Sequence, residues 1–214
     1  MIVYGSSMSP FVRKVLVFAA EKGIAFDHKS LGLGSDDSDF LGASPFRKMP
    51  ALKDGDFGIS DSSAIVAYLE AVQPEPGLIP TEAKARARTI WFDEYADTIL
   101  GGCGTKLFFN RIVAPRFLGR EGDAALADAA ERDELPPILD YLEGVIPGSL
   151  FLVEDRLTLA DIAVASPLVN LGHVGCDYAS GRPKLAAFAA AMLARPSFAP
   201  WVERERAFLE RTAA

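Results

Sequence analysis

Cysteine and histidine are scarce in this chain of 214 residues, which contains two of each. Cys103 and Cys176 are isolated, and neither His28 nor His173 lies at a ligand-like spacing from them. Zinc sites and disulfide frameworks both need such residues in clusters, so the sequence predicts no metal site and no disulfide scaffold. The expected setting is a reducing one, the cytoplasm.

Long apolar runs and basic clusters are also missing. No stretch approaches the roughly 18 apolar residues of a membrane-spanning helix. The first residues, MIVYGSSMSP, lack the charged and apolar segments of a signal peptide. Lys and Arg total 22 against 29 Asp and Glu, a net charge of −7. We therefore expect neither a nucleic acid nor a membrane as a partner.

The first third of the chain alternates between strand and helix patterns. We expect strands at 1–4 and 24–29, a tight hairpin around Asp54-Gly55, and helices starting at Pro10 and Ser62. The following stretch, QPEPGLIP, holds three prolines and a glycine and is typical of a linker. The sequence thus predicts an α/β domain over 1–75 and a linker over 76–83.

The remainder, 84–214, has helical patterns only, which predicts an all-α domain. The expected helices cover 83–116, 123–145 with a kink at Pro136-Pro137, 158–171, and two shorter segments starting at Pro183 and near Ser197. In the segment RLTLADIAVASPL, Thr158 and Asp161 have the spacing of a capping box, so we assign Asp161 to folding rather than to chemistry.

Three serines crowd the start of the first predicted helix, in SSMSPFVRKV (6–15). Ser9-Pro10 is a favourable pair for positions N-cap and N1, so Ser9 need do no more than start the helix. A helix N-terminus also offers free N–H groups and partial positive charge, which suit a bound thiolate. The segment GSSMS lacks the last glycine of a serine-hydrolase elbow, which argues against a serine nucleophile.

Four motifs follow one another along the chain. They are SPFVRKV after the first strand, SPFRKMPAL before the hairpin, ISDSSAIVAYLE after it, and RLTLADIAVASPL in the helical half. Together they resemble the glutathione transferase family over the whole chain. The resemblance implies a thioredoxin-like domain followed by a helical one, glutathione as co-substrate without a metal, and a homodimer. The implied activity is attack of the glutathione thiolate on a small apolar electrophile.

The resemblance also assigns roles to individual residues. It implies that Ser9 donates to the glutathione thiolate, with Arg13 adding positive potential. Tyr4, Ser6 and Ser7 are rival donors, of which Tyr4 is the more serious. The full set implied to bind glutathione is Ser9, Phe11, Lys48, Met49, Pro50, Asp61 and Ser62.

Within that set, Lys48 is expected near the glycyl carboxylate, with Arg47 assisting or simply exposed. A cis Met49-Pro50 bond would present the Met49 backbone to the cysteinyl part of glutathione. Asp61 would meet the amine and Ser62 the γ-glutamyl carboxylate. Capping of the next helix by Ser60 or Asp61 is the plain alternative, and both can hold.

The sequence gives fewer indications about the site of the second substrate, the electrophile. Phe11, Trp91, Tyr95 and Phe108 are candidates to line an apolar pocket for the electrophile, although aromatic residues at helical spacing are more often core. Isomerisation, peroxide reduction and ether cleavage are alternative glutathione-dependent reactions. A non-catalytic scaffold is the remaining alternative, against which the set Ser9, Lys48, Pro50 and Asp61-Ser62 argues.

Overall fold

The computed structural model describes residues 1–212 and divides into two compact units between Pro80 and Thr81. The division falls inside the segment 76–83 that the sequence assigned to a linker. No helix of the described residues is both long enough and apolar enough to cross a membrane.

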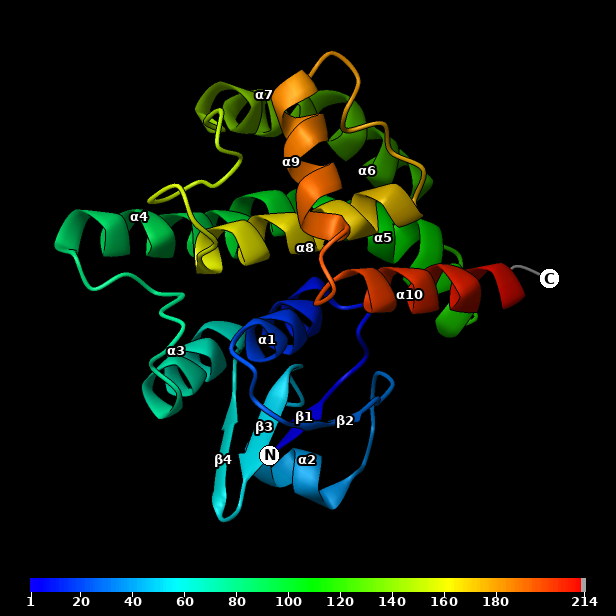
Figure 1. Ribbon diagram of the computed structural model, residues 1–214. Coiled ribbons are helices and arrows are strands. Elements are labelled where there is room, and N and C mark those ends of the chain that lie inside the picture. Colours follow the sequence, from blue (N-terminus) through cyan, green and yellow to red (C-terminus); the bar gives the residue numbers. More distant parts are fainter. Residues whose placement is uncertain (213–214) are drawn as a thin grey trace. The chain divides into compact units, whose positions relative to one another are not determined.

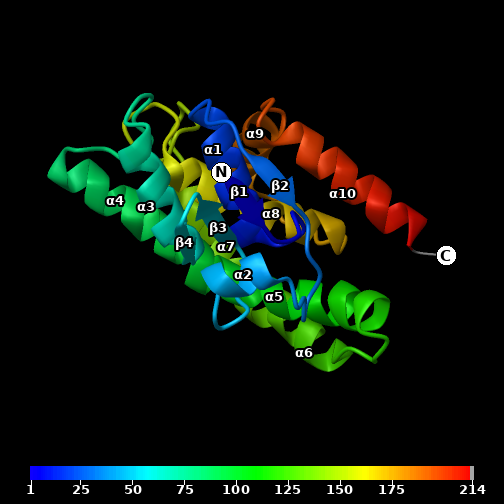
Figure 2. The same cartoon turned by 90° about the horizontal axis from the view of Figure 1, so that it is seen from below.

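The first unit is a four-stranded mixed sheet with helices on both faces (Figures 1 and 2). Its elements are β1 (Ile2–Tyr4), α1 (Pro10–Glu21), β2 (Asp27–Lys29), α2 (Ser38–Ala43), β3 (Ala51–Asp54), β4 (Phe57–Ser60) and α3 (Ser62–Val72). The strand order is β2-β1-β3-β4, with β2 parallel to β1 and the other pairs antiparallel. Helices α1 and α3 pack together on one face, and α2 packs on the other. The predicted thioredoxin-like fold is confirmed.

One local prediction needs correction, and one helix was not predicted. Strand β2 covers only Asp27–Lys29 rather than 24–29, and helix α2 is the element without a prediction. Helix α2 has six residues and only two buried apolar anchors, Phe40 and Ala43, which is too few for a visible helical period. Its N-cap, Asp37, accepts a hydrogen bond from Phe40 N at 2.9 Å. The hairpin is confirmed, with Asp54 paired to Phe57 around the tight turn.

A buried ion pair fastens the stretch after α3 to the first unit. The Lys22 side chain is fully buried, and its Nζ lies 2.6 Å from Glu70 Oε2 and 2.7 Å from Pro76 O. Glu70 also accepts hydrogen bonds from the backbone N–H groups of Leu78 and Ile79. The proline-rich stretch therefore belongs to the first unit as far as Pro80, because its backbone is bound there.

The second unit contains helices only, as predicted. These are α4 (Ala83–Glu94), α5 (Gly101–Phe108), α6 (Ala124–Ala129), α7 (Leu135–Val145), α8 (Leu159–His173), α9 (Pro183–Leu193) and α10 (Ala199–Arg211), with π-helical segments at Tyr95–Leu100, Phe109–Phe117 and Ala130–Glu134. Helix α8 is its centre: every residue from Leu159 to Leu171 is buried, and α4, α5 and α9 pack against it (Figure 1).

The capping box at the start of α8 is present as predicted. Asp161 Oδ2 accepts a hydrogen bond from Thr158 N at 2.8 Å, and Asp161 Oδ1 accepts one from Leu152 N at 2.8 Å. Asp161 is fully buried, and this burial raises the pKa of its carboxyl group to about 6. The side chain thus joins the preceding loop to the helix at the centre of the unit.

Candidate active site

The sheet topology brings the three predicted glutathione motifs to one edge of the first unit. Tyr4 is paired with Ala51, and Ala51 with Ser60, in antiparallel ladders. The chain leaving β1, the chain entering β3 and the chain leaving β4 therefore meet at the same edge. These segments carry Ser9, then Lys48 to Pro50, then Asp61 and Ser62.

Two close contacts join these segments directly. Asp61 N donates a hydrogen bond to Pro50 O at 3.3 Å. Gly5, at φ +126°, lies so close to its neighbours that a Cβ there would be 2.7 Å from Val12 Cγ2 and 3.1 Å from Met49 Cβ. The loop leading to Ser9 thus packs against Met49, so the three motifs are in direct contact with one another.

Ser9 is the N-cap of the twelve-residue helix α1. Its Oγ accepts from Val12 N at 3.5 Å, and its own N–H donates to Ser6 O at 3.0 Å. Capping uses the hydroxyl as an acceptor, so the Ser9 O–H remains available as a donor; it has no partner among residues 1–212. The capping role is present, and it leaves the hydroxyl hydrogen free for a ligand.

Of the rival donors, Tyr4 and Ser7 are buried, whereas Ser6 is half-buried like Ser9 and its Oγ accepts a hydrogen bond from Met8 N at 3.4 Å. Tyr4 is completely buried in a cluster with Phe40, Ala43 and Ala51, and burial raises the pKa of its hydroxyl. The Tyr4 hydroxyl has no hydrogen-bond partner within the described chain. Ser7 is 7% exposed.

Of the two neighbouring cations, only Lys48 is uncommitted. Ser44 Oγ holds the Lys48 backbone, donating to its carbonyl oxygen at 2.8 Å and accepting from its N–H at 2.9 Å. The exposed Lys48 ammonium forms no ion pair with any described residue, whereas Arg47 pairs with Asp36 at 2.8 Å. The Met49-Pro50 peptide bond is cis.

Asp61 is the N-cap of α3, accepting from Ala64 N at 2.9 Å through Oδ1. Its backbone φ of 87° is rare for a residue other than glycine, and such strain is concentrated at functional sites. Ser62 follows at the first helical position and is buried. Of the two residues proposed for capping, the structure uses Asp61, and this leaves its Oδ2 without a bond to a described residue.

The predicted aromatic candidates have different environments. Phe11 is half-buried on α1, while Tyr95 and Phe108 are buried in the second unit. Tyr95 donates to Ile138 O at 2.7 Å and lies 5.3 Å from the Tyr141 ring centroid. Trp91, 49% exposed, donates its indole N–H to the Tyr141 hydroxyl at 3.1 Å. The structure thus adds Tyr141 on α7 to this group, a residue that no sequence pattern marked.

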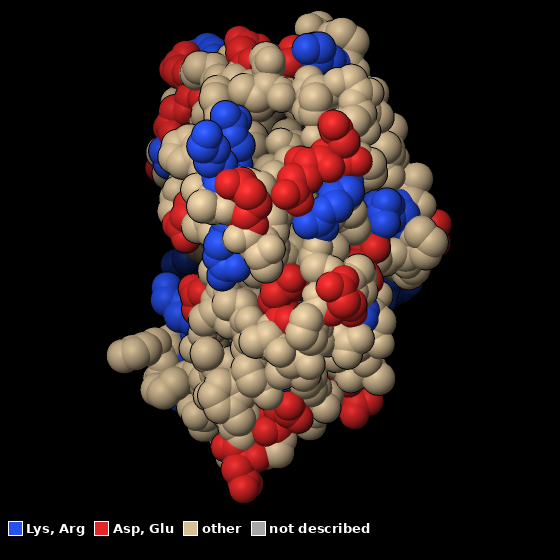
Figure 3. Space-filling view, turned by 60° about the vertical axis from the view of Figure 1, so that its left-hand side comes forward, with Lys and Arg blue, Asp and Glu red and all other residues tan. Residues whose placement is uncertain are grey.

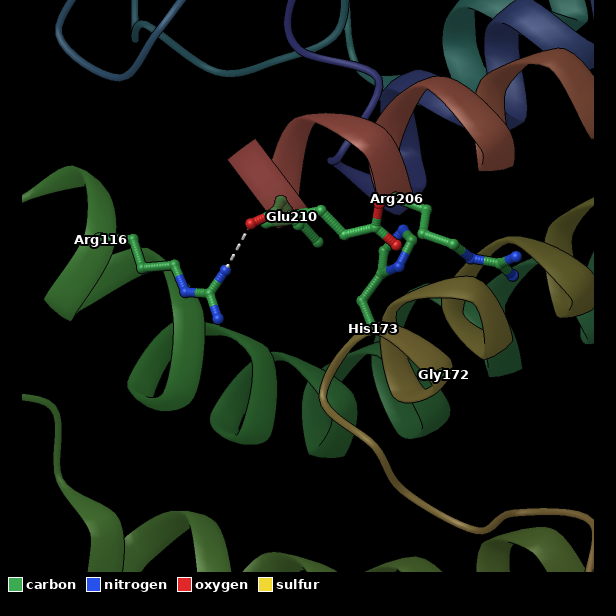
Figure 4. A pocket seen from close by; sticks show the side chains of 6 residues that line it. Arg116, Gly172, His173, Arg206 and Glu210 are labelled. Carbon is green, nitrogen blue, oxygen red and sulfur yellow. Dashed lines mark hydrogen bonds between the residues drawn. The ribbon is translucent and has the colours of Figure 1, made fainter. Parts of the chain in front are cut away.

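A separate hollow of about 250 Å³ lies within the second unit (Figure 4). It is lined by Arg116, Gly172, His173, Arg206, Leu209 and Glu210. Arg116 Nη1 donates to Leu209 O at 3.1 Å, and His173 Nε2 lies 3.0 Å from Glu205 Oε2. None of the predicted site residues lines this hollow.

Neither cysteine is placed for thiol chemistry. Both are free and buried, and burial raises the pKa of Cys103 to about 11 and that of Cys176 to about 12. On the face shown in Figure 3, acidic and basic side chains are interspersed, with no continuous basic surface. Buried thiols with raised pKa values are poor nucleophiles, so neither cysteine is a candidate for the site chemistry.

Comparison with known proteins tests the resemblance. Residues 3–77 match the family model described as "Glutathione S-transferase, N-terminal domain", and residues 110–205 match "Glutathione S-transferase, C-terminal domain". The chain is 32% identical to mouse glutathione S-transferase theta-3, over 87% of this chain and 79% of the relative. The chain belongs to the glutathione S-transferase family.

Other relatives agree with this family assignment. Human glutathione S-transferase theta-1 is 33% identical over 86% of this chain and 78% of its own. A human theta-class transferase, solved in complex with the glutathione conjugate of 1-menaphthyl sulfate, superposes with a TM-score of 0.87 at 26% identity, covering 99% of this chain and 89% of that one. The predicted family is confirmed. It is an enzyme family whose co-substrate is glutathione.

Proposed function

We propose that this protein catalyses attack of the glutathione thiolate on a small apolar electrophile, with Ser9 as the activating hydroxyl. The proposal depends on one observation. The Ser9 O–H lies at the N-terminus of α1 and donates to no described residue, and it is at the same edge of the sheet as Lys48, the cis Met49-Pro50 bond and the N-terminus of α3. The matches to transferases over both units support it.

The energetic demand on Ser9 and α1 is modest. A free thiol has a pKa of about 8.5, so only a few per cent is thiolate at neutral pH. Lowering that pKa by about 2 units requires about 2.8 kcal/mol of preferential stabilisation. A helix N-terminus supplies roughly 0.3–2 kcal/mol to an anion, and a hydrogen bond to a charged group roughly 1.5–3 kcal/mol. The two together meet the demand.

Each remaining group matches one part of the tripeptide. The unpaired Lys48 ammonium suits the glycyl carboxylate, and the Met49 backbone suits the cysteinyl amide groups, as an added short strand. The N–H groups at the start of α3, with Ser62, suit the γ-glutamyl carboxylate. The Asp61 carboxylate suits the ammonium group, because capping uses only its Oδ1.

Phe11, Trp91, Tyr95 and Phe108 remain our candidates for the electrophile pocket. Trp91 has the largest exposed surface among the three in the second unit. The human theta-class relative was solved in complex with the glutathione conjugate of 1-menaphthyl sulfate, which supports an organic electrophile as the second substrate. We also propose a homodimer in a reducing, cytoplasmic setting, supported by the 86% exposed Phe46 and by two free cysteines.

The test compares Ser9→Ala with Ser6→Ala as the matched control. Glutathione affinity is measured by calorimetry, and the pKa of the bound thiol by its ultraviolet thiolate band. Ser9→Ala is expected to raise that pKa by about 1–2 units while affinity changes little, because one hydrogen bond to the thiolate is lost. Ser6→Ala is expected to match the wild type. Absence of glutathione binding by the wild type would overturn the proposal.

A further inference from the structure

The backbone of Gly5 is held on both sides by strand β2. Gly5 N donates a hydrogen bond to Lys29 O at 3.1 Å. The imidazole Nε2 of His28 lies 2.8 Å from Gly5 O. His28 is half-buried and pairs with Val3 in the parallel ladder, so its backbone is itself fixed by β1. Both polar backbone groups of Gly5 are thus committed to one neighbouring strand.

Gly5 has little freedom to move without disturbing the candidate site. A Cβ on Gly5 would meet Val12 at 2.7 Å and Met49 at 3.1 Å, so the backbone passes between the first turns of α1 and the residue before Pro50. Its φ of +126° is open to glycine and strained for other residues. Beyond it, Ser6 O accepts from Ser9 N at 3.0 Å. A shift of the Gly5 carbonyl would therefore be passed on to Ser9.

We infer that His28 is a positioning residue of the glutathione site: through Gly5 O it sets where the Ser9 hydroxyl and the Met49 backbone lie. This inference rests on the proposed function. A carbonyl oxygen only accepts, so Nε2 carries the hydrogen in this bond. His28 does not touch the reacting sulfur; it acts through the loop.

Two substitutions separate the hydrogen bond from the bulk of the side chain. His28→Gln retains an N–H donor at about the reach of Nε2, whereas His28→Leu removes the donor and retains much of the volume. The matched control is His173→Leu, which removes the other histidine from its bond to Glu205 in the second unit. That control reports what loss of stability alone does to the measurements.

The measurements are the pKa of bound glutathione, kcat and KM for glutathione, and the thermal midpoint. We expect His28→Leu to raise the thiol pKa and to lower kcat/KM about tenfold, because a misplacement of 1 Å can cost as much as about a hundredfold. His28→Gln is expected to restore both values to within about twofold of the wild type. His173→Leu is expected to lower the thermal midpoint without moving the thiol pKa.

Hydrogen exchange of residues 5–9 in the free protein provides a readout that needs no glutathione. Faster exchange there in His28→Leu, with α3 unchanged, would show that His28 holds this loop in place. This readout is independent of glutathione, so failure of the wild type to bind glutathione would contradict the proposed function without changing the result for the loop. Three results would overturn the inference. The first is unchanged exchange in His28→Leu, and the second is a lower thermal midpoint of His28→Leu with an unchanged thiol pKa. The third is equal impairment of His28→Gln and His28→Leu.

Discussion

The buried Asp161 carboxyl group makes the stability of the protein depend on pH in a direction opposite to that of most carboxylates. Its pKa is raised from 3.8 to about 6, chiefly by burial. The hydrogen bonds from Leu152 N, Thr158 N and Thr158 Oγ1 act the other way and only partly offset the burial. The perturbation that tests this balance is Asp161→Asn, which removes the titration and keeps the size of the side chain.

The sign and size follow from proton linkage. Between the unfolded and folded pKa values the folded state keeps its proton while the unfolded state has lost it, so the free energy of unfolding falls as pH rises. Relative to Asp161→Asn, the wild type is expected to lose about 1.4 kcal/mol between about pH 5 and about pH 7.5. The loss levels off above the folded pKa, where both states are ionised.

The assay is urea unfolding of both proteins across that pH range, monitored by circular dichroism. Every other carboxyl group titrates alike in the two proteins and cancels in their difference. A difference that stays constant with pH would show that Asp161 remains ionised and that its hydrogen-bond donors outweigh burial. A difference that grows in favour of the wild type as pH rises would refute the reasoning.

Three further predictions concern Tyr4, Lys22 and Lys48. Tyr4→Phe removes a buried hydroxyl that has no hydrogen-bond partner in the described part of the chain, so we expect unchanged activity and a free energy of unfolding that is equal or higher by about 1 kcal/mol. An activity loss like that of Ser9→Ala would instead make Tyr4 the donor. Lys22→Met leaves Glu70 without its buried cation, and we expect unfolding to become easier by about 3 kcal/mol, with faster proteolysis in 73–80; an unchanged urea midpoint would contradict this. Lys48→Met is expected to raise KM for glutathione about tenfold with kcat retained, for loss of a charged contact, while Arg47→Met serves as the control; equal effects of the two would contradict the assignment.

Much of the fold could be predicted from local patterns. Ser9-Pro10 marks the start of α1, Asp54-Gly55 the hairpin, and Pro183 the start of α9, and each element is present. These signals work because caps, prolines and tight turns act over a few residues of chain. Helix α2 escaped prediction because its capping residue, Asp37, precedes only six helical residues.

The candidate site was predicted as a set of residues, and its geometry was not. Ser9, Lys48 and Asp61 are separated by long stretches of chain, and only the antiparallel pairing of β3 with β1 and β4 brings them to one edge. The role of His28 had no sequence signal, because its bond to Gly5 O crosses from one strand to a neighbouring loop.

The amino-acid sequence alone established the family, the order of its α/β and helical halves, and the residue types available to a thiolate, since local motifs in a fixed order carry that information. Tertiary structure decided which of these groups are usable. Tyr4 is buried in the core and Arg47 pairs with Asp36, whereas Ser9 and Lys48 keep donors that have no partner among residues 1–212. Burial and pairing depend on segments distant in the chain, which is why no local pattern reveals them.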